Sequence, residues 1–190
     1  MAADRPLSHP RSTSPRSMQA PQAPQATPDQ RSFTDLGVPA GLTAVLAENG
    51  ITAPFPIQTA TLPDSLAGRD VLGRGRTGSG KTYAFVLPVL ARLAASGSPR
   101  RPKSPRALIL APTRELASQI EASIAPLAKG LSLRTLTVFG GVGANPQITG
   151  LKAGVDVLVA CPGRLEDLIS SGHADLSQVC LLYTSDAADE

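Results

Sequence analysis

The sequence predicts an α/β protein built on one parallel sheet with helices on both faces. Apolar runs of strand length alternate with segments of helical periodicity from residue 70 to residue 172. Strand–helix alternation at this spacing requires crossover connections, which make the strands parallel. The chain has 190 residues, of which 42% are hydrophobic, and no internal repeat, so it has room for one domain with a sizeable core.

The N-terminal segment differs in composition from the rest of the chain. Residues 1–31 include the biased run QAPQAPQATPDQ. Such a segment buries too little apolar surface to offset its ordering entropy, so we expect a disordered tail. An alternative is that its arginines tether RNA weakly, these being Arg5, Arg11, Arg16 and Arg31.

The ordered elements are expected to begin after Phe33. Apolar residues keep helical spacing from Leu36 to a C-terminal stop at Gly50, and Pro56 opens a second short helix. The polar, Pro-rich stretch 96–106 predicts a mobile surface connection. The strands are expected at 70–74, 106–111, 133–138 and 155–160, and the later helices at 81–93, 113–130 and 163–172.

Composition excludes several classes of function. Only 3% of the residues are aromatic and none is Trp, which argues against an aromatic platform for single-stranded bases. A net charge of +3 permits a nucleic-acid partner without requiring one. Two cysteines, Cys161 and Cys180, and two distant histidines, His9 and His173, cannot make a disulfide framework or a zinc site.

Localisation follows from the same features. The free cysteines fit a reducing compartment, and the N-terminus has no apolar core of signal-peptide type. The longest strongly apolar stretch, 83–91, is too short to span a bilayer. We therefore expect a cytoplasmic protein with no membrane association.

A phosphate-binding loop is the strongest functional signal. The run GRTGSGKT over 75–82 follows a predicted strand, opens a predicted helix and fits the pattern G-x-x-x-x-G-K-[ST]. Its glycines let backbone N–H groups converge on phosphate oxygens at a helix N-terminus. Lys81 would reach the β- and γ-phosphates of ATP, and the Thr82 hydroxyl would ligate Mg²⁺. The predicted nucleotide-binding residues of this loop are Arg76, Thr77, Gly78, Ser79, Gly80, Lys81 and Thr82.

A glutamine upstream of the loop gives the first sign of a family. The segment GITAPFPIQ ends at Gln58, and Phe33 lies seventeen residues before its first glycine, Gly50. Alone, Gln58 would be an ordinary surface residue. Ahead of a phosphate loop, the segment resembles the Q motif of the DEAD-box RNA helicases. This resemblance implies that the Gln58 amide reads adenine and that Phe33 packs near the base.

Three later motifs resemble the same family, in the same order. They are PTRELA from Pro112, the double glycine Gly140-Gly141, and CPGR from Cys161. The resemblance spans about 33–179 and implies a RecA-like P-loop NTPase domain that contacts the RNA backbone. The RNA-contacting residues that it implies are Pro112, Thr113, Arg114, Gly140, Gly141, Cys161, Gly163 and Arg164.

Two residues depart from the family pattern. Gly75 replaces the usual Ala at the start of the phosphate loop, which should be harmless. Cys161 replaces the Thr of T-P-G-R, which removes a hydroxyl partner for the RNA backbone.

The C-terminal segment does not fit the strand–helix pattern. Residues 180–190, CLLYTSDAADE, resemble a translated adapter of transposon-based sequencing libraries. We therefore expect an artefact there and a sheet that stops before its next strand, opened by residues 176–179, has paired. Asp186 and Asp189 are rejected as a degenerate D-E-A-D motif, because the residues before them do not read as an apolar strand. No catalytic residue is assigned, since the D-E-A-D motif is missing.

The sequence thus divides into four parts and supports two functions. The parts are a tail (1–31), a Q-motif segment (32–60), an incomplete first RecA-like helicase domain (61–179) and the adapter-like end (180–190). The first function is the N-terminal part of an ATP-dependent RNA helicase, and the second is an inactive ATP- and RNA-binding module. The second predicts no RNA-stimulated ATP hydrolysis by the 190-residue chain. A DNA translocase or another phosphate-loop ATPase is disfavoured by the Q motif, PTRELA and CPGR, while the RNA target and oligomeric state are left open.

Overall fold

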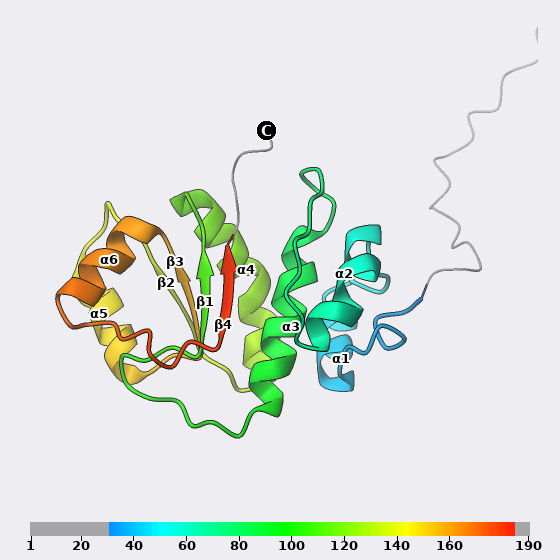
Figure 1. Ribbon diagram of the computed structural model, residues 1–190, viewed down its shortest axis with the longest axis horizontal. Helices are drawn as coiled ribbons and strands as arrows, with labels where there is room; N and C mark the ends of the chain where they lie inside the picture. Colours follow the sequence, from blue (N-terminus) through cyan, green and yellow to red (C-terminus); the bar gives the residue numbers. More distant parts are fainter. Residues whose placement is uncertain (1–30, 185–190) are drawn as a thin grey trace, which may run out of the picture.

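The computed structural model describes residues 31–184, so the predicted tail, except for Arg31, and the two aspartates 186 and 189 lie outside the described residues. Figure 1 shows a sheet with helices on either side of it. In chain order the described elements are α1 (Ala40–Glu48), α2 (Pro56–Leu66), α3 (Lys81–Ala95), β1 (Ala107–Leu110), α4 (Arg114–Gly130), β2 (Thr135–Val138), α5 (Ala144–Ala153), β3 (Val157–Ala160), α6 (Pro162–Ser170) and β4 (Leu181–Thr184).

The sheet confirms the predicted parallel α/β architecture. Its strand order is β2-β3-β1-β4, and every pairing is parallel. The first residues of the four strands are in register, with Ala107 opposite Val157 and Leu181, and Thr135 opposite Val157. Strands β1, β2 and β3 lie within the predicted strand ranges. Because the strands start together, their carboxyl ends also meet at one edge of the sheet.

Two apolar clusters hold the helices against the two faces of the sheet. Alternate residues of a strand face opposite sides, so Ile109 of β1 joins one cluster and Leu108 joins the other. The larger cluster joins this sheet to α1, α2, α3 and α4, and the smaller one joins it to α5 and α6. Strands β1 (ALIL) and β3 (VLVA) are almost wholly apolar because both of their faces are covered.

Helix α1 begins four residues later than the sequence predicts. Leu36 lies in a turn, and the helix starts at Ala40 after Pro39, which has φ −58° and ψ 145°. Proline disfavours the helical conformation in the residue before it, so the apolar periodicity starting at Leu36 cannot continue as one helix. The second predicted helix is confirmed as α2, with Pro56 at its first turn.

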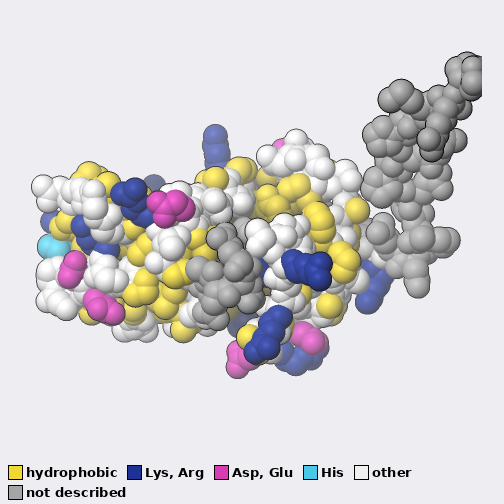
Figure 2. All heavy atoms as spheres, turned by 90° about the horizontal axis from the view of Figure 1, so that it is seen from above, with side chains coloured by type: hydrophobic (Ala, Val, Ile, Leu, Met, Phe, Trp, Pro, Cys, Tyr) yellow, Lys and Arg dark blue, Asp and Glu magenta, His cyan; other side chains and the backbone are white. Residues whose placement is uncertain are grey.

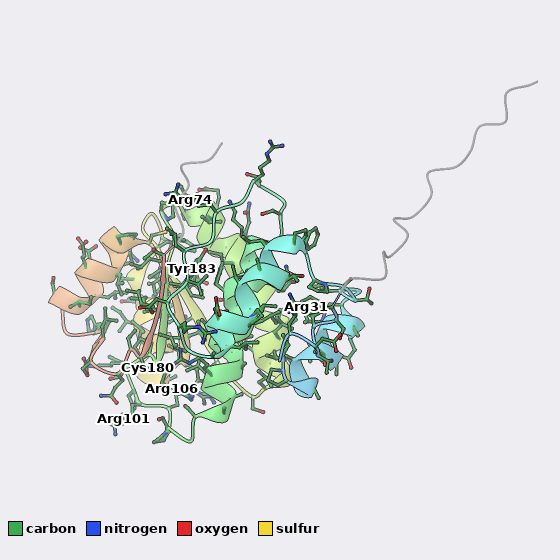
Figure 3. The ribbon with its side chains drawn as sticks, turned by 45° about the vertical axis from the view of Figure 1, so that its right-hand side comes forward. Arg31, Arg74, Arg101, Arg106, Cys180 and Tyr183 are labelled. Atoms are coloured by element: carbon green, nitrogen blue, oxygen red, sulfur yellow. The ribbon has the colours of Figure 1, made fainter. Side chains whose placement is uncertain are left out.

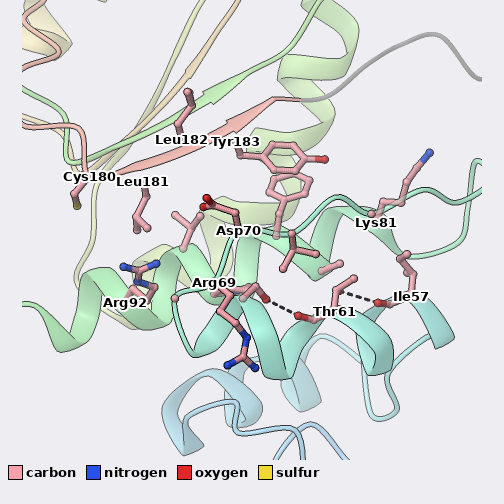
Figure 4. A pocket seen from close by; sticks show the side chains of 18 residues that line it. Ile57, Thr61, Arg69, Asp70, Lys81, Arg92, Cys180, Leu181, Leu182 and Tyr183 are labelled. Carbon is pink, nitrogen blue, oxygen red and sulfur yellow. Dashed lines mark hydrogen bonds between the residues drawn. The ribbon is translucent and has the colours of Figure 1, made fainter.

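The strand predicted over 70–74 is wrong. These residues form no strand, and the side chain of Leu72 is 84% exposed. A strand needs a neighbour for its backbone hydrogen bonds, and none of the described strands lies beside this segment. A cavity of about 310 Å³ is lined both by this segment, through Val71 and Gly73, and by Leu181 of β4. Figure 4 shows Asp70 of the segment and Leu181 of β4 around it.

The expectation of a sheet ending at β1 is also wrong. Residues 181–184 form β4, which pairs with β1 in parallel, whereas residues 176–179 form no strand. The argument that no apolar strand precedes Asp186 therefore fails, because Leu181 and Tyr183 of β4 pack against the larger apolar cluster. The adapter origin of 180–190 stays a prediction.

A buried carboxylate ties the connection 96–106 to the sheet. Asp156 is fully buried and forms ion pairs with Arg100 at 2.6 Å and Arg106 at 2.9 Å. Its carboxylate also accepts a hydrogen bond from the backbone N–H of Arg134 at 2.8 Å. Arg106 in turn donates to the carbonyl of Leu93 at the end of α3. The connection predicted as a mobile surface loop is thus anchored to the buried Asp156 by both of these arginines.

We expect Asp156→Ala to lower the free energy of unfolding by about 3 kcal/mol or more, because it leaves the Arg106 guanidinium buried without its carboxylate. The measurement is urea unfolding followed by circular dichroism. Asp64→Ala is the matched control, since Asp64 pairs with Arg69 at an exposed site. That change should cost less than about 1 kcal/mol. Equal losses in the two variants would contradict a structural role for the Asp156 cluster.

Candidate functional site

The predicted phosphate loop, residues 75–82, runs into the first turn of α3 and leaves the N-terminus of that helix open. No side chain caps α3, whose N-cap is Gly80. Gly78 and Gly80 have φ of 78° and 84°, in the left-handed region that side chains other than glycine rarely adopt. The loop therefore presents backbone N–H groups and the positive end of the helix dipole, which together favour an anion.

The side chains of the loop are arranged around this open end. The Lys81 Nζ donates to the carbonyl of Gly75 at 2.5 Å, and the Ser79 hydroxyl is buried without a hydrogen-bond partner. Arg76 and Thr77 are exposed, and Thr82 is half-buried on the first turn of α3. An ammonium group and an unpartnered hydroxyl beside free N–H groups fit a polyphosphate.

A magnesium ion fits this site only together with a nucleotide. Within residues 31–184, no group of three or more His, Cys, Asp or Glu side chains could hold a metal ion. Thr82 offers one hydroxyl oxygen, and Mg²⁺ commonly takes its remaining ligands from phosphate oxygens and water. The donor set thus suits Mg²⁺ bound to a triphosphate rather than a resident metal centre.

The Gln58 amide is bound to the backbone on both sides. Its Nε2 donates to the carbonyl of Gly80 at 2.8 Å, and its Oε1 accepts from the N–H of Phe55 at 2.9 Å. The side chain is fully buried. The structure brings Gln58 to the phosphate loop, as its predicted role requires, and it adds a structural link between α2 and the loop that sequence reasoning missed.

The two phenylalanines near this site have different environments. Phe33 is 4% exposed and packs in the larger apolar cluster, so the structure does not bring it to the phosphate loop. Its contact with adenine stays a prediction. Phe55 is 48% exposed and lies against Gly80. Sequence reasoning missed Phe55, although its place three residues before Gln58 was a signal.

The predicted RNA-contacting residues gather where β1, β2 and β3 end. Thr113 caps α4 by accepting a hydrogen bond from the N–H of Leu116. The Arg114 guanidinium lies next to Gly141, 3.3 Å from where a Cβ on that glycine would be. Pro112, Gly140 and Gly163 are also exposed. We call the set Pro112, Thr113, Arg114, Gly140, Gly141, Cys161, Gly163 and Arg164 the strand-end surface.

Arg164 and Gln147 donate hydrogen bonds to the loop 139–143, which contains Gly140 and Gly141. The Arg164 Nη2 donates to the carbonyl of Val142 at 3.0 Å, while its Nη1 is buried without a hydrogen-bond partner. The Gln147 Nε2 donates to the carbonyl of Phe139 at 3.1 Å, just before the double glycine. Gln147 is a second residue that sequence reasoning missed, because nothing in its spacing distinguishes it from other helical glutamines.

The phosphate loop and the strand-end surface lie at the same edge of the molecule (Figure 1). Figure 2 looks onto this edge and shows Lys and Arg side chains scattered among apolar ones rather than gathered into one patch. Contacts of the drawn side chains with a polyanion would therefore depend on individual groups.

The Cys161 thiol differs from an ordinary cysteine. Burial raises its pKa, and the negative charge of Glu115 raises it further. Because the thiolate is the reactive form, less of it is present at a given pH. The thiol thus remains a weak hydrogen-bonding group at neutral pH.

Comparisons with known proteins agree with this arrangement. The family model for DEAD/DEAH box helicases matches residues 55–185. A maize protein, DEAD-box ATP-dependent RNA helicase 3A, chloroplastic, is 44% identical over 166 residues, covering 86% of this chain and 22% of that protein. The ATP-dependent RNA helicase DBP2 of Encephalitozoon cuniculi is 40% identical over 157 residues, covering 83% and 32% respectively.

Solved structures resemble the chain in fold as well. The crystal structure of the RNA helicase Prp28 from Chaetomium thermophilum bound to ADP matches with a TM-score of 0.76 and 38% identity, over 85% of this chain and 40% of that one. The fold is thus the RecA-like fold of the Prp28 helicase domain. The chain spans between a fifth and a third of the length of the two relatives named above. Across the described part of the chain, no helix is long and apolar enough to cross a membrane.

We expect iodoacetamide at pH 8 to alkylate Cys180 faster than Cys161, because Cys180 is exposed whereas the Cys161 pKa is raised. Mass spectrometry of timed samples measures both rates in one reaction. Glu115→Gln removes one cause of the raised Cys161 pKa and should therefore speed the alkylation of Cys161 without changing that of Cys180. Faster labelling of Cys161 than of Cys180 in the unsubstituted chain would contradict this ordering.

Proposed function

The chain belongs to the DEAD/DEAH box helicase family, and on that premise we propose that it binds ATP with Mg²⁺ and the backbone of RNA, as the N-terminal part of an ATP-dependent RNA helicase. One observation carries the proposal: the Q-motif glutamine, Gln58, contacts Gly80 of an uncapped phosphate loop. In this proposal the amide that reads the base would lie beside the loop that holds the phosphates. In the longer protein that we propose, ATP hydrolysis separates short RNA duplexes.

The phosphates of ATP would lie on the backbone N–H groups of 76–82. Lys81, which donates to the carbonyl of Gly75 here, would exchange that neutral acceptor for charged β- and γ-phosphate oxygens. Thr82 would hold Mg²⁺, which neutralises phosphate charge when bound. The unpartnered Ser79 hydroxyl supports a further phosphate contact.

The base would be recognised through Gln58. An amide offers a donor and an acceptor side by side, which match the N7 and N6 of adenine. Each end of the amide makes one backbone contact and keeps a second hydrogen-bonding position for the base. The side chain is fully buried, so base binding would shift the contacts with Phe55 or Gly80. Adenine recognition would therefore be coupled to the position of the phosphate loop.

RNA would contact the strand-end surface through its phosphates and riboses. The buried Arg164 Nη1 has no partner and suits a phosphate oxygen, and the exposed Arg114 lies next to Gly141. Gly140 and Gly141 let the RNA backbone approach closely. Contacts of this kind carry little sequence preference. We also propose a cytoplasmic location, which the free cysteines Cys161 and Cys180 support.

We expect Lys81→Ala to abolish ATP binding, because the loop then loses its only ammonium group. We expect Gln58→Ala to weaken the binding of ATP more than that of GTP, because only the amide distinguishes the base. Calorimetric titration of the full chain with both nucleotides measures this. Lys129→Ala, at the far end of α4, is the control and should change neither affinity. Equal weakening of ATP and GTP by Gln58→Ala would mean that Gln58 acts only through the loop.

We expect Arg114→Ala to weaken RNA binding by a similar factor for unrelated single-stranded sequences, and to lower the dependence of log Kd on log salt by about 0.7. Fluorescence anisotropy at several salt concentrations measures both effects. Arg101→Ala is the matched control, because Arg101 is also an exposed arginine. Figure 3 shows Arg101 on the side of the molecule opposite to Arg74, which lies just before the predicted phosphate loop. A sequence-dependent loss in Arg114→Ala would contradict backbone recognition.

A further inference from the structure

Phe55 is the most exposed aromatic side chain of this protein. The chain has four Phe and two Tyr residues and no Trp. All six lie within the described part, and five of them are buried or half-buried against the larger apolar cluster. The Phe55 side chain is 48% exposed. Phe55 is therefore the aromatic side chain that a ligand can reach most readily.

The ring of Phe55 lies against the phosphate loop. A Cβ built on Gly80 would stand 2.8 Å from Cδ2 and 2.9 Å from Cγ of the ring. The same Cβ would stand 2.6 Å from the Gln58 Nε2. Gly80 is therefore in contact with the ring and the amide together, and the remaining ring surface faces solvent beside the two groups that the proposed nucleotide site uses.

The backbone holds Phe55 in place. Pro54 and Pro56 flank it and restrict the backbone on both sides, and its N–H donates to the Gln58 Oε1 at 2.9 Å. A phenylalanine side chain also has few rotatable bonds to immobilise. The entropic cost of immobilising the Phe55 side chain under a bound ligand is therefore small.

We propose that Phe55 is a stacking surface for the base of the nucleotide bound at the phosphate loop, an inference that rests on the proposed function. The ring contacts Gly80 of the loop that would hold the phosphates, so a base joined to those phosphates would lie within reach of the ring. Every base has a π-face, so stacking adds affinity without choosing the base. In this proposal Phe55 adds affinity for any base, and Gln58 distinguishes adenine from the other bases.

The simpler reading is that the ring only packs against Gly80 and shapes the loop. The two readings differ in one measurable respect. A packing role affects every ligand of the loop, including tripolyphosphate, which has no base. A stacking role affects ATP and GTP alike and leaves tripolyphosphate unchanged.

The test is calorimetric titration of the full chain and its Phe55 variants with ATP, GTP and tripolyphosphate, each with Mg²⁺. Phe55→Ala should weaken ATP and GTP about 5-fold to 100-fold, with tripolyphosphate changed less than about twofold. Phe55→Leu keeps apolar bulk without the π-face, and most of the loss should persist. Phe55→Trp should bind both nucleotides at least as tightly as the unsubstituted chain.

Three outcomes would overturn the stacking role: unchanged nucleotide affinity in Phe55→Ala, an equal loss for tripolyphosphate, or full recovery in Phe55→Leu. Each leaves the proposed function standing as long as Lys81→Ala abolishes binding. If the unsubstituted chain binds neither ATP nor tripolyphosphate, or if Lys81→Ala retains both, the proposed function fails and the stacking role fails with it.

Discussion

The buried carboxylate of Asp156 is the contact on which the arrangement of the sheet depends. It lies directly before β3 and joins Arg100, Arg106 and the backbone N–H of Arg134, which precede β1 and β2. Three segments distant in sequence are thereby held at the amino ends of their strands. Burial of a charge is costly unless it is paired and hydrogen-bonded, so this cluster tolerates few alternative arrangements.

Alignment at the amino edge determines what meets at the carboxyl edge. Strands β1, β2 and β3 have four residues each and pair in register from their first to their last residues. Thr113, Gly140 and Cys161 follow these strands within three residues. Parallel strands bring such segments to one edge, and Arg114 and Arg164 then hold them close to one another. The strand-end surface is thus a consequence of register as much as of its own residues.

The phosphate loop is positioned by a different contact. No described strand supports residues 70–74, so the loop is held mainly from α2, through the bond between Gln58 and Gly80, and from α3, which it begins. Two glycines with positive φ make this geometry possible without strain. The proposed base-reading amide and the proposed phosphate site therefore belong to one hydrogen-bonded unit, so a change in the position of one would alter the position of the other.

The amino-acid sequence by itself determined the parallel α/β class, three of the four strands and the family. These depend on local periodicity and on motifs that need particular residues in a particular order. Tertiary structure alone decided which aromatic ring faces the phosphate loop, since burial of Phe33 and exposure of Phe55 follow from packing between distant segments. It also decided that 70–74 form no strand while 181–184 do, because an apolar run becomes a strand only where a neighbouring strand accepts its hydrogen bonds.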